Sequence, residues 1–427
     1  MDAGRLVVVC GAGLSMAAPS SLPSAQAIAE LCFDAHRLNA DPDLDLALRQ
    51  DLEALAEHFV GLDMLQSIFI ERLVPWQAFV RPSNAGHAAV ADFLITRAAA
   101  AGLSSNYDTL IERKAWDYGF DFRASLDGHQ ASEQALTQGP LLKFHGCSHI
   151  DRRSTVWAQS QLDDATVSAR IERSKIWMAA NLRQRDLLVV GFWSDWDYLN
   201  AVLGAALEEV APLSVTVIDP SETGQLEAKA PDLWALAHQP HVTFTHVRES
   251  GATALDELRR AFSTNYVRKV LAAGRTAFEA STGAVCNPEW LEVAPFDSET
   301  LYGWRRDAEG VPISTAATKL RPDQSEALGF FHLLLRRAGA EQLPEGYSLG
   351  GRSIRVVNGA SAVLSSLRTR FAEAPAASAT DITVAVGATD LGLPGNVMRP
   401  GRTGDFIRPA AEGRWYEVAG ARAELNI

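Results

Sequence analysis

Residues 6–15, LVVVCGAGLS, join an apolar run to a glycine turn and a serine. Glycines in such a turn let the backbone approach a phosphate closely, and the N-terminus of a following helix favours its negative charge. The dinucleotide fingerprint would need a further glycine where Met16 stands, and the P-loop would need a lysine before the position of Ser15. The turn therefore indicates a phosphate ligand, but it matches neither of these two motifs.

Polar residues also follow four later apolar runs, in SSNYD (104–108), FHGCS (144–148), GFWSDWD (191–197) and IDP (218–220). In an open parallel sheet, ligands bind at the carboxyl ends of the strands. If the runs are parallel strands, these four segments and the glycine turn meet at one edge. We therefore expect a single site there.

Two of these segments carry candidate catalytic groups. His145 is a candidate base or hydroxyl partner, because imidazole ordinarily titrates near neutral pH. Asn106 can orient a ligand, although it or Asp108 could instead cap the following helix. Asp219 ends a strand, where acidic residues accept hydrogen bonds from a ribose. His87, on an apolar helix, is predicted to serve packing.

The elements expected to position these residues alternate along the chain. Strands are predicted at 6–10, 98–106, 141–146, 186–192, 214–220 and 241–247, most of them followed by helical patterns. That order predicts a parallel sheet covered by helices on both faces. Residues 24–97 read as a helical insertion that forms a layer or lid over the first strand's loop. Within it, Asp41-Pro42 and Ser83 are predicted to start helices.

The chain of 427 residues is predicted to form two domains, 1–270 and 271–427. A helix at 252–262 is expected to close the first. In the second, residues 273–323 look loop-rich, with Trp290 and Trp304 exposed. Asp323 then caps an apolar helix, and a small βαβ unit spans 353–386. Exposed tryptophans and the FFHLLL stretch could anchor an interface or form an ordinary core.

Composition bounds the function. The net charge of −13 argues against a general electrostatic grip on nucleic acid or an anionic membrane. Four scattered cysteines include no CxxC pair, so we expect neither a disulfide framework nor a zinc site, and they suit a reducing cytoplasm. No apolar stretch is long enough to span a bilayer. The protein is expected to be cytoplasmic.

In order along the chain, GAGLS, NYD, HG, GFWS and VID resemble the motifs of the sirtuin family, in its bacterial zinc-free branch. The resemblance covers about residues 6–262. It implies a Rossmann-like parallel sheet with helices on both faces and the helical insertion, followed by a smaller α/β C-terminal domain. It also implies NAD⁺ as the substrate.

The resemblance assigns roles to individual residues of this chain. Gly11, Ala12 and Gly13 would line the diphosphate, and Ser15 would donate a hydrogen bond. Asn106 would face the nicotinamide ribose and help orient a water, with His145 as its polar partner. The remaining cofactor-binding candidates are Asp108, Gly191, Ser194 as a phosphate ligand, and Asp219 on the adenosine ribose.

Departures from the family narrow the reaction. Protein-deacetylating sirtuins carry two CxxC pairs for zinc and a Pro-x-Phe-Arg segment, and this sequence has neither. Hydrolysis of NAD⁺ to nicotinamide and ADP-ribose is therefore the predicted reaction, with water as the acceptor. The alternatives are an NAD-dependent deacylase or ADP-ribosyltransferase, and a non-catalytic NAD or ADP-ribose sensor that scaffolds a complex.

The resemblance further implies a biological setting. Bacterial proteins of this shape resemble effectors of anti-phage abortive infection. The size of the chain and its added C-terminal module look most like the sirtuin-like partner of a HerA-type ATPase, with a short Argonaute as the alternative partner. We expect a homo-oligomer whose C-terminal module docks the ATPase that switches on NAD⁺ cleavage.

Overall fold

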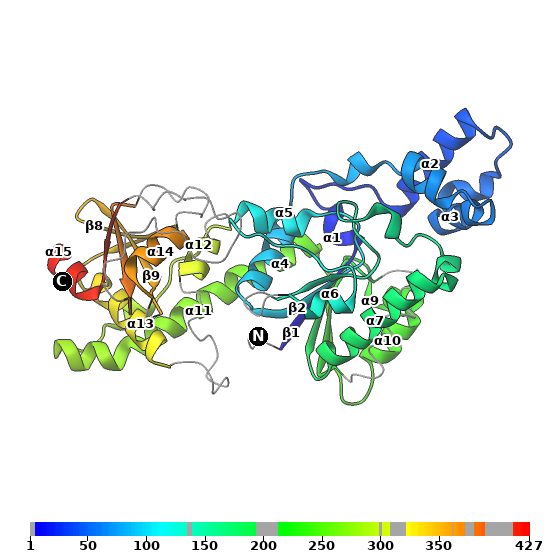
Figure 1. The fold of residues 1–427 in the computed structure, drawn as a ribbon. Helices are drawn as coiled ribbons and strands as arrows, with labels where there is room; N and C mark the ends of the chain where they lie inside the picture. The colour runs from blue at the N-terminus through cyan, green and yellow to red at the C-terminus, as the bar shows by residue number, and fades with distance from the viewer. Residues whose placement is uncertain are drawn as a thin grey trace. The chain divides into compact units, whose positions relative to one another are not determined.

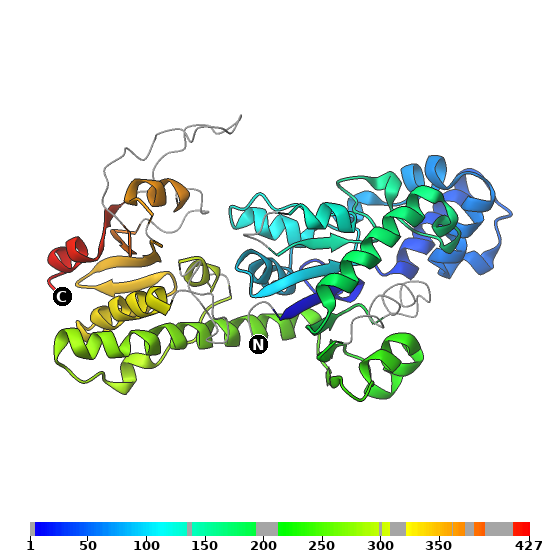
Figure 2. The same cartoon turned by 60° about the horizontal axis from the view of Figure 1, so that its bottom comes forward.

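The computed structural model describes residues 5–134, 139–193, 212–298, 301–307, 322–360, 362–371, 380–388 and 413–427. The chain divides into two compact units. The first comprises Met1–Trp116 and Phe120–Glu257, and the second comprises Asp117–Gly119 and Leu258–Ile427. The division falls within helix α11 (Gly251–Thr282), a single long helix in Figure 2. The helix predicted at 252–262 is therefore much longer than expected, and the first unit ends within it, at Glu257.

The first unit is built on a six-stranded parallel sheet in the order β3-β2-β1-β4-β5-β6. The strands are β1 (Leu6–Cys10), β2 (Ala99–Ser104), β3 (Leu141–Lys143), β4 (Asp186–Val190), β5 (Ser214–Ile218) and β6 (Thr243–Val247). All five residues of β1 are buried, as expected for a central strand covered on both faces. The predicted α/β, Rossmann-like fold class is confirmed.

Helices pack against both faces of this sheet (Figure 1). One face shares a core with α6 (Gly128–Ser132), α7 (Ala165–Leu182), α9 (Thr223–Lys229) and α10 (Pro231–Ala237). On the other, α4 (Ala85–Ile95) packs against β2. Gly251, the first residue of α11, lies so close to Val190 of β4 that an added Cβ would meet its side chain at 2.5 Å. Every α4 residue after Ala85 is buried, so this helix is one of those that cover the sheet and is not part of the insertion.

The insertion between β1 and α4 folds around an apolar core of its own. Its elements are α2 (Ala25–Asn39), η1 (Leu46–Gln50), α3 (Leu52–Gly61), η2 (Leu65–Leu73, a π-helix) and η3 (Trp76–Phe79). Phe33, Phe59 and Phe69 fill this core together with Tyr107 and Trp157 from the sheet's loops. The helical character predicted for the insertion is confirmed.

Two helix starts predicted in this region are wrong. Asp41-Pro42 lies in a turn, and α3 begins at Leu52, where the Asp51 side chain accepts a hydrogen bond from the Ala54 amide at 2.9 Å. The cap of α4 is Asn84 rather than Ser83. In both places an Asp or Asn directly before the helix accepts a hydrogen bond from a free amide of its first turn. Several polar residues stand close together there, and the sequence does not show which of them is the cap.

Short elements complete the first unit: α1 (Ala12–Met16), α5 (Leu110–Asp117), η4 (Arg152–Ser154) and η5 (Gln159–Asp163). The second unit holds a five-stranded sheet in the order β11-β10-β9-β8-β7. Its strands are β7 (Glu341–Leu343), β8 (Gly346–Leu349), β9 (Arg352–Asn358), β10 (Ile382–Val386) and β11 (Arg414–Tyr416). Its other described elements after α11 are η6 (Pro288–Leu291), α12 (Leu301–Asp307), α13 (Pro322–Arg337), α14 (Leu364–Phe371) and α15 (Val418–Leu425).

The predicted βαβ unit is present, because β9 and β10 pair in parallel around α14. The antiparallel strands β7 and β8 were not predicted. Asp323, predicted to cap this region's apolar helix, lies within α13, whose described residues begin at Pro322.

The apolar residues considered as interface anchors lie in the second unit's core. Phe331, Leu333 and Leu335 of the FFHLLL stretch are fully buried. Trp304 is only 6% exposed, and its indole nitrogen donates to the Pro344 carbonyl oxygen at 2.5 Å. Trp290 packs against the same core while partly exposed. The expected exposure of Trp304 is therefore wrong, and the stretch serves an ordinary core.

We expect Trp304→Ala to destabilise the second unit by about 3–5 kcal/mol, since it removes a large buried aromatic side chain. The measurement is urea unfolding followed by circular dichroism, with Trp290→Ala as the partly exposed comparison and a smaller expected effect. A Trp304→Ala protein that unfolds at the wild-type midpoint would contradict its place in the core.

Candidate active site

A cavity lies at the carboxyl ends of four adjacent strands of the first unit. The register aligns Cys10 of β1 with Ser104 of β2 and Val190 of β4, and Ser104 with Lys143 of β3. The residues that follow these strand ends therefore come out at one level. They form the polar floor of the cavity: Gly11, Ala12, Ser15, Ser105, Asn106, Asp108, His145 and Gly191. Strand order reverses between β1 and β4, the switch point at which such folds bind ligands.

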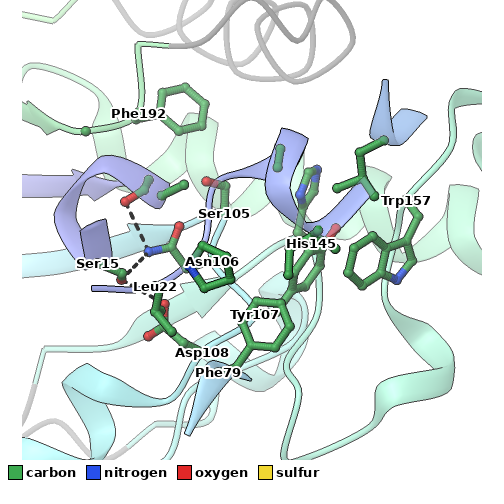
Figure 3. Close-up of a pocket in the computed structure, with 17 residues that line it drawn as sticks. Ser15, Leu22, Phe79, Ser105, Asn106, Tyr107, Asp108, His145, Trp157 and Phe192 are labelled. Carbon is green, nitrogen blue, oxygen red and sulfur yellow. Dashed lines mark hydrogen bonds between the residues drawn. The ribbon is translucent and has the colours of Figure 1, made fainter. Parts of the chain in front are cut away.

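The segment between β1 and α4 and the loops after β2, β3 and β4 cover this floor with apolar side chains (Figure 3). The covering residues are Leu22, Pro23, Ala25, Ile28, Leu52, Phe79, Tyr107, Trp157 and Phe192. The cavity measures about 150 Å³. Small-molecule sites usually span ~300–1,000 Å³, so these walls enclose only part of a dinucleotide-sized ligand.

The Ser15 hydroxyl is the centre of a buried hydrogen-bond network. It donates to Asp108 Oδ2 at 2.8 Å. Ser15 Oγ accepts a hydrogen bond from Asn106 Nδ2 at 3.2 Å, and His87 Nε2 lies 3.1 Å from Ser15 Oγ. A hydroxyl has one donor and two acceptor positions, so these three contacts use its full capacity. The hydrogen that was expected to reach a phosphate is instead held by Asp108.

His87 is held in one tautomer by its two partners. Its Nδ1 accepts a hydrogen bond from the Asn84 amide at 3.1 Å, so the proton belongs on Nε2 and points to Ser15. Asn84 Oδ1 in turn accepts from the His87 amide at 3.1 Å, which completes a reciprocal cap of α4. Burial lowers the pKa of His87 to about 4. This histidine, expected only to pack, orients the site from the start of α4.

The amide orientation of Asn106 follows from its neighbours. Nδ2 lies 3.1 Å from the Gly11 carbonyl oxygen, which can only accept, and also donates to Ser15. Both amide hydrogens are therefore used, and Oδ1 is the group that Asn106 offers to the cavity. Asp108 also accepts from the Leu110 amide through Oδ1 at 3.0 Å, so it caps α5 as well. Asp108 therefore has both of the roles considered for it: one oxygen contacts Ser15 in the site, and the other caps the following helix.

His145 lies against a stack of aromatic rings. Its ring is nearly parallel to that of Tyr107 at 6.0 Å between centroids, and Tyr107 stacks on Trp157 at 4.3 Å. Burial, helped by the charge of Arg170, lowers the pKa of His145 to about 3. His145 is therefore neutral at physiological pH. The expectation that it titrates near neutrality is wrong, because burial of the ring, which stacks on Tyr107, disfavours the charged imidazolium.

The glycine turn packs directly on the end of β4. The Gly11 amide donates to the Val190 carbonyl and the Gly13 amide donates to the Gly191 carbonyl, both at 3.0 Å. A Cβ added to Gly11 would lie 2.5 Å from Gly191 O. Gly191 has φ +59°, and its Cβ would lie 2.4 Å from Leu14 N. These glycines allow the ends of β1 and β4 to lie in close contact. The amides of Gly11 and Gly13 donate to carbonyl oxygens at the end of β4, so only the Ala12 amide of the turn is left for a phosphate.

A buried ion pair supports the floor from behind. Lys143 Nζ lies 2.9 Å from Glu112 Oε1 and donates to the Asp108 carbonyl oxygen. Burial alone would lower the pKa of this ammonium. The nearby Glu112, Cys147 and Asp108 raise the pKa by a larger amount, so it lies above its ordinary value and Lys143 is charged. Its contact with the Asp108 carbonyl fixes the backbone that carries the Asp108 carboxylate.

Two predicted site residues do not line the cavity, and the placement of a third is not described. Gly13 lies in the turn without lining the cavity. Asp219 accepts from the Ser221 amide at 2.8 Å and lies 3.7 Å from Lys229 Nζ, away from Asn106 and His145. Ser194 lies outside the described residues. Sequence reasoning in turn missed His87, Tyr107 and Trp157, and only the Asn84–His87 spacing of a capping box could have pointed to one of them.

All four cysteines of the chain lie in the described ranges and are buried as free thiols. Within those ranges, no group of three or more His, Cys, Asp or Glu side chains is placed to hold a metal ion. None of the helices described is long and apolar enough to cross a membrane.

Sheet order and cavity position together define a Rossmann-like α/β protein with a cavity at its switch point. No protein-family model matches the sequence, and no curated protein matches it. Solved structures of Sir2 homologues are similar to it. A Sir2 homologue–NAD complex is 16% identical and covers 59% of this chain and 87% of that chain, with a TM-score of 0.33.

Two further structures are similar at the same level. A mutant Sir2 homologue in complex with 2′-O-acetyl ADP ribose is 16% identical, covering 59% of this chain and 89% of that chain, with a TM-score of 0.30. A structure titled for the mechanism and regulation of Sir2 enzymes is 14% identical, covering 60% and 91%, with a TM-score of 0.33.

We expect Gly191→Ala to destabilise the first unit by about 1–3 kcal/mol, because its positive φ and its contact with Leu14 N both oppose a Cβ. The matched control is Gly224→Ala in α9, where nothing lies within 4 Å and alanine should stabilise the helix by up to about 1 kcal/mol. Thermal unfolding measures both. Equal shifts in the two variants would refute the close contact.

Stability should fall as the pH falls from about 6.5 towards 4. His87 is neutral when folded, with its pKa lowered to about 4, but an unfolded histidine takes up a proton below about 6.5. The unfolded state then binds the extra proton, which lowers the unfolding free energy by about 1.4 kcal/mol per pH unit in that window. His87→Gln should reduce this slope, and the same change at the exposed His129 should not. Urea unfolding at pH 7, 6 and 5 tests this, and equal slopes in the two variants would contradict it.

Proposed function

We propose that NAD⁺ binds with its nicotinamide ribose in this cavity and that the chain hydrolyses it to nicotinamide and ADP-ribose. One observation carries the proposal. Asn106 Oδ1 is fixed as an acceptor on the floor of a largely apolar cavity at the switch point of the sheet. The motif order GAGLS, NYD, HG supports the choice of NAD⁺, since all three motifs contribute to that floor.

The proposed reaction breaks the bond between the ribose C1′ and the nicotinamide nitrogen. Nicotinamide leaves as a neutral molecule with both electrons of that bond, and the ribose carbon develops oxocarbenium character. Water adds its oxygen to this carbon and releases one proton to solvent. Because the leaving group starts as a cation, the step needs an oriented water and little proton transfer.

The residues of the cavity divide the work accordingly. Asn106 Oδ1 accepts a hydrogen bond from the water and holds it at the reacting carbon. His145 is too weak a base to take the proton early, because its pKa is about 3, so it acts as a neutral hydrogen-bond partner. Phe79, Tyr107 and Trp157 exclude other water from the ribose.

Ser15, His87 and Asp108 act as positioning residues. They hold the Asn106 amide in one orientation before the ligand arrives. A rotated amide would present hydrogens instead of Oδ1 and would repel the water's own hydrogens. We expect loss of the Ser15 hydroxyl to lower kcat more than it weakens NAD⁺ binding.

The setting implied by the sequence resemblance is a separate proposal. In it, the chain is a bacterial anti-phage effector that depletes NAD⁺ under the control of a HerA-type ATPase, and it assembles as a homo-oligomer. The apolar residues first considered as anchors for such a partner fill the second unit's core, so they do not support this docking. The partner and the oligomeric state stay predictions.

We expect Asn106→Ala to lower NAD⁺ cleavage by at least 100-fold, because it removes the acceptor that the network around Ser15 holds in a fixed orientation. Chromatography of NAD⁺ incubated with the pure chain measures nicotinamide and ADP-ribose. The matched control is Asn39→Ala on the exposed end of α2, which should cleave at the wild-type rate.

Each other outcome has a defined meaning. Wild-type cleavage by Asn106→Ala contradicts the role of this residue. Binding of NAD⁺ without release of nicotinamide favours the sensor alternative. Release of nicotinamide with ADP-ribose attached to a protein or an acyl group favours the transferase or deacylase alternative.

A further inference from the structure

Ser105 lies beside Asn106 on the floor of the candidate active site, in the loop that follows β2 (Figure 3). Its amide donates a hydrogen bond to the Cys10 carbonyl oxygen at 3.1 Å, so the backbone here continues the pairing of β2 with β1. The side chain is half-buried. The sheet therefore fixes where this side chain leaves the backbone at the cavity floor.

The Ser105 hydroxyl has its hydrogen-bonding capacity unused. Of the residues that the structure describes, none forms a hydrogen bond with this oxygen. The oxygen is not enclosed by protein atoms and is open to the cavity. A hydroxyl offers one hydrogen and two acceptor positions. Ser105 therefore presents an acceptor to a molecule that occupies the cavity.

Two neighbouring polar groups of the floor are already occupied. Ser15 Oγ makes three contacts, and the Asp108 oxygens accept hydrogen bonds from Ser15 and from the Leu110 amide. Asn106 presents Oδ1, because both hydrogens of its amide are used. Ser105 Oγ and Asn106 Oδ1 are thus two open acceptors on consecutive residues of one loop.

An attacking water needs two acceptors. Water reacts with a carbon through a lone pair of its oxygen, so both of its hydrogens must point away from that carbon. The cavity walls are largely apolar, and an O–H group without an acceptor is costly in such surroundings. Asn106 Oδ1 holds one hydrogen. A second acceptor next to it would hold the other and turn the lone pair toward the ribose C1′.

We propose that Ser105 is a catalytic residue that accepts this second hydrogen bond from the attacking water. The role rests on the proposed function, because it concerns the same reaction. It also makes the site selective for water over alcohols. An alcohol has a single O–H hydrogen, which Asn106 holds alone, so its attack gains little from Ser105.

Methanol provides a test of this selectivity, because it can take the place of water in the same step. Its oxygen adds to C1′, nicotinamide leaves with both electrons of the broken bond, and the hydroxyl proton passes to solvent. The product is O-methyl-ADP-ribose, which chromatography separates from ADP-ribose. The ratio of the two products measures the choice between water and methanol, whatever the overall rate.

Ser105→Ala should lower kcat for hydrolysis about tenfold and leave KM for NAD⁺ near its wild-type value. In buffer that contains methanol, the ratio of O-methyl-ADP-ribose to ADP-ribose should rise about fivefold or more in this variant. Ser105→Thr keeps a hydroxyl and should restore the wild-type ratio. The matched control is Ser67→Ala, at an exposed position of η2 that does not line the cavity, which should behave as wild type.

Four results would overturn the proposal. Wild-type kcat and product ratio in Ser105→Ala would contradict the role of Ser105 and leave the proposed function standing. A lower kcat with an unchanged ratio would make the role of this hydroxyl structural. ADP-ribose found on Ser105 by mass spectrometry would show that the hydroxyl attacks C1′ itself. A wild-type chain that releases no nicotinamide would refute the proposed function and this role together.

Discussion

The Ser15 hydroxyl sets the geometry on which the candidate site depends. A single oxygen can make three hydrogen bonds, and here they connect α1 to two other parts of the chain. These are the loop after β2, through Asn106 and Asp108, and the start of α4, through His87. No partner can be exchanged without leaving a buried group unsatisfied, which is costly in a site closed to water. Asn106 is thereby presented to the cavity in one orientation only.

The glycine contact between β1 and β4 complements this network. Gly11, Gly13 and Gly191 bring the two strand ends together without side chains between them. That closeness places Gly191 and Phe192 in the wall of the cavity beside Ala12. The same glycines that suggest a phosphate turn in the sequence therefore serve first to join the sheet at its switch point.

Much of the fold follows from local patterns in the sequence, and less of the site does. Buried apolar runs and their polar ends predict the six parallel strands, so Asn106 and His145 could be placed at one edge. His87 could not, because its hydrogen bond to Ser15 spans 72 positions and depends on how α4 packs. The neutral state of His145 likewise depends on its burial against Tyr107, which follows a different strand. Trp304 seemed exposed because its sequence surroundings are polar, while its core neighbours Phe331 and Tyr347 lie far along the chain.

Tyr107 and Trp157 belong at once to the core of the insertion and to the wall of the cavity. If the insertion moved away from the sheet as a rigid body, it would therefore expose aromatic side chains of its own core to water. Ligand entry has to proceed by smaller movements of side chains such as Leu22, Leu52 and Phe79. The shared rings also tie the evolution of the cover to that of the sheet: an insertion of different sequence would fold here only if it kept a place for both aromatic side chains.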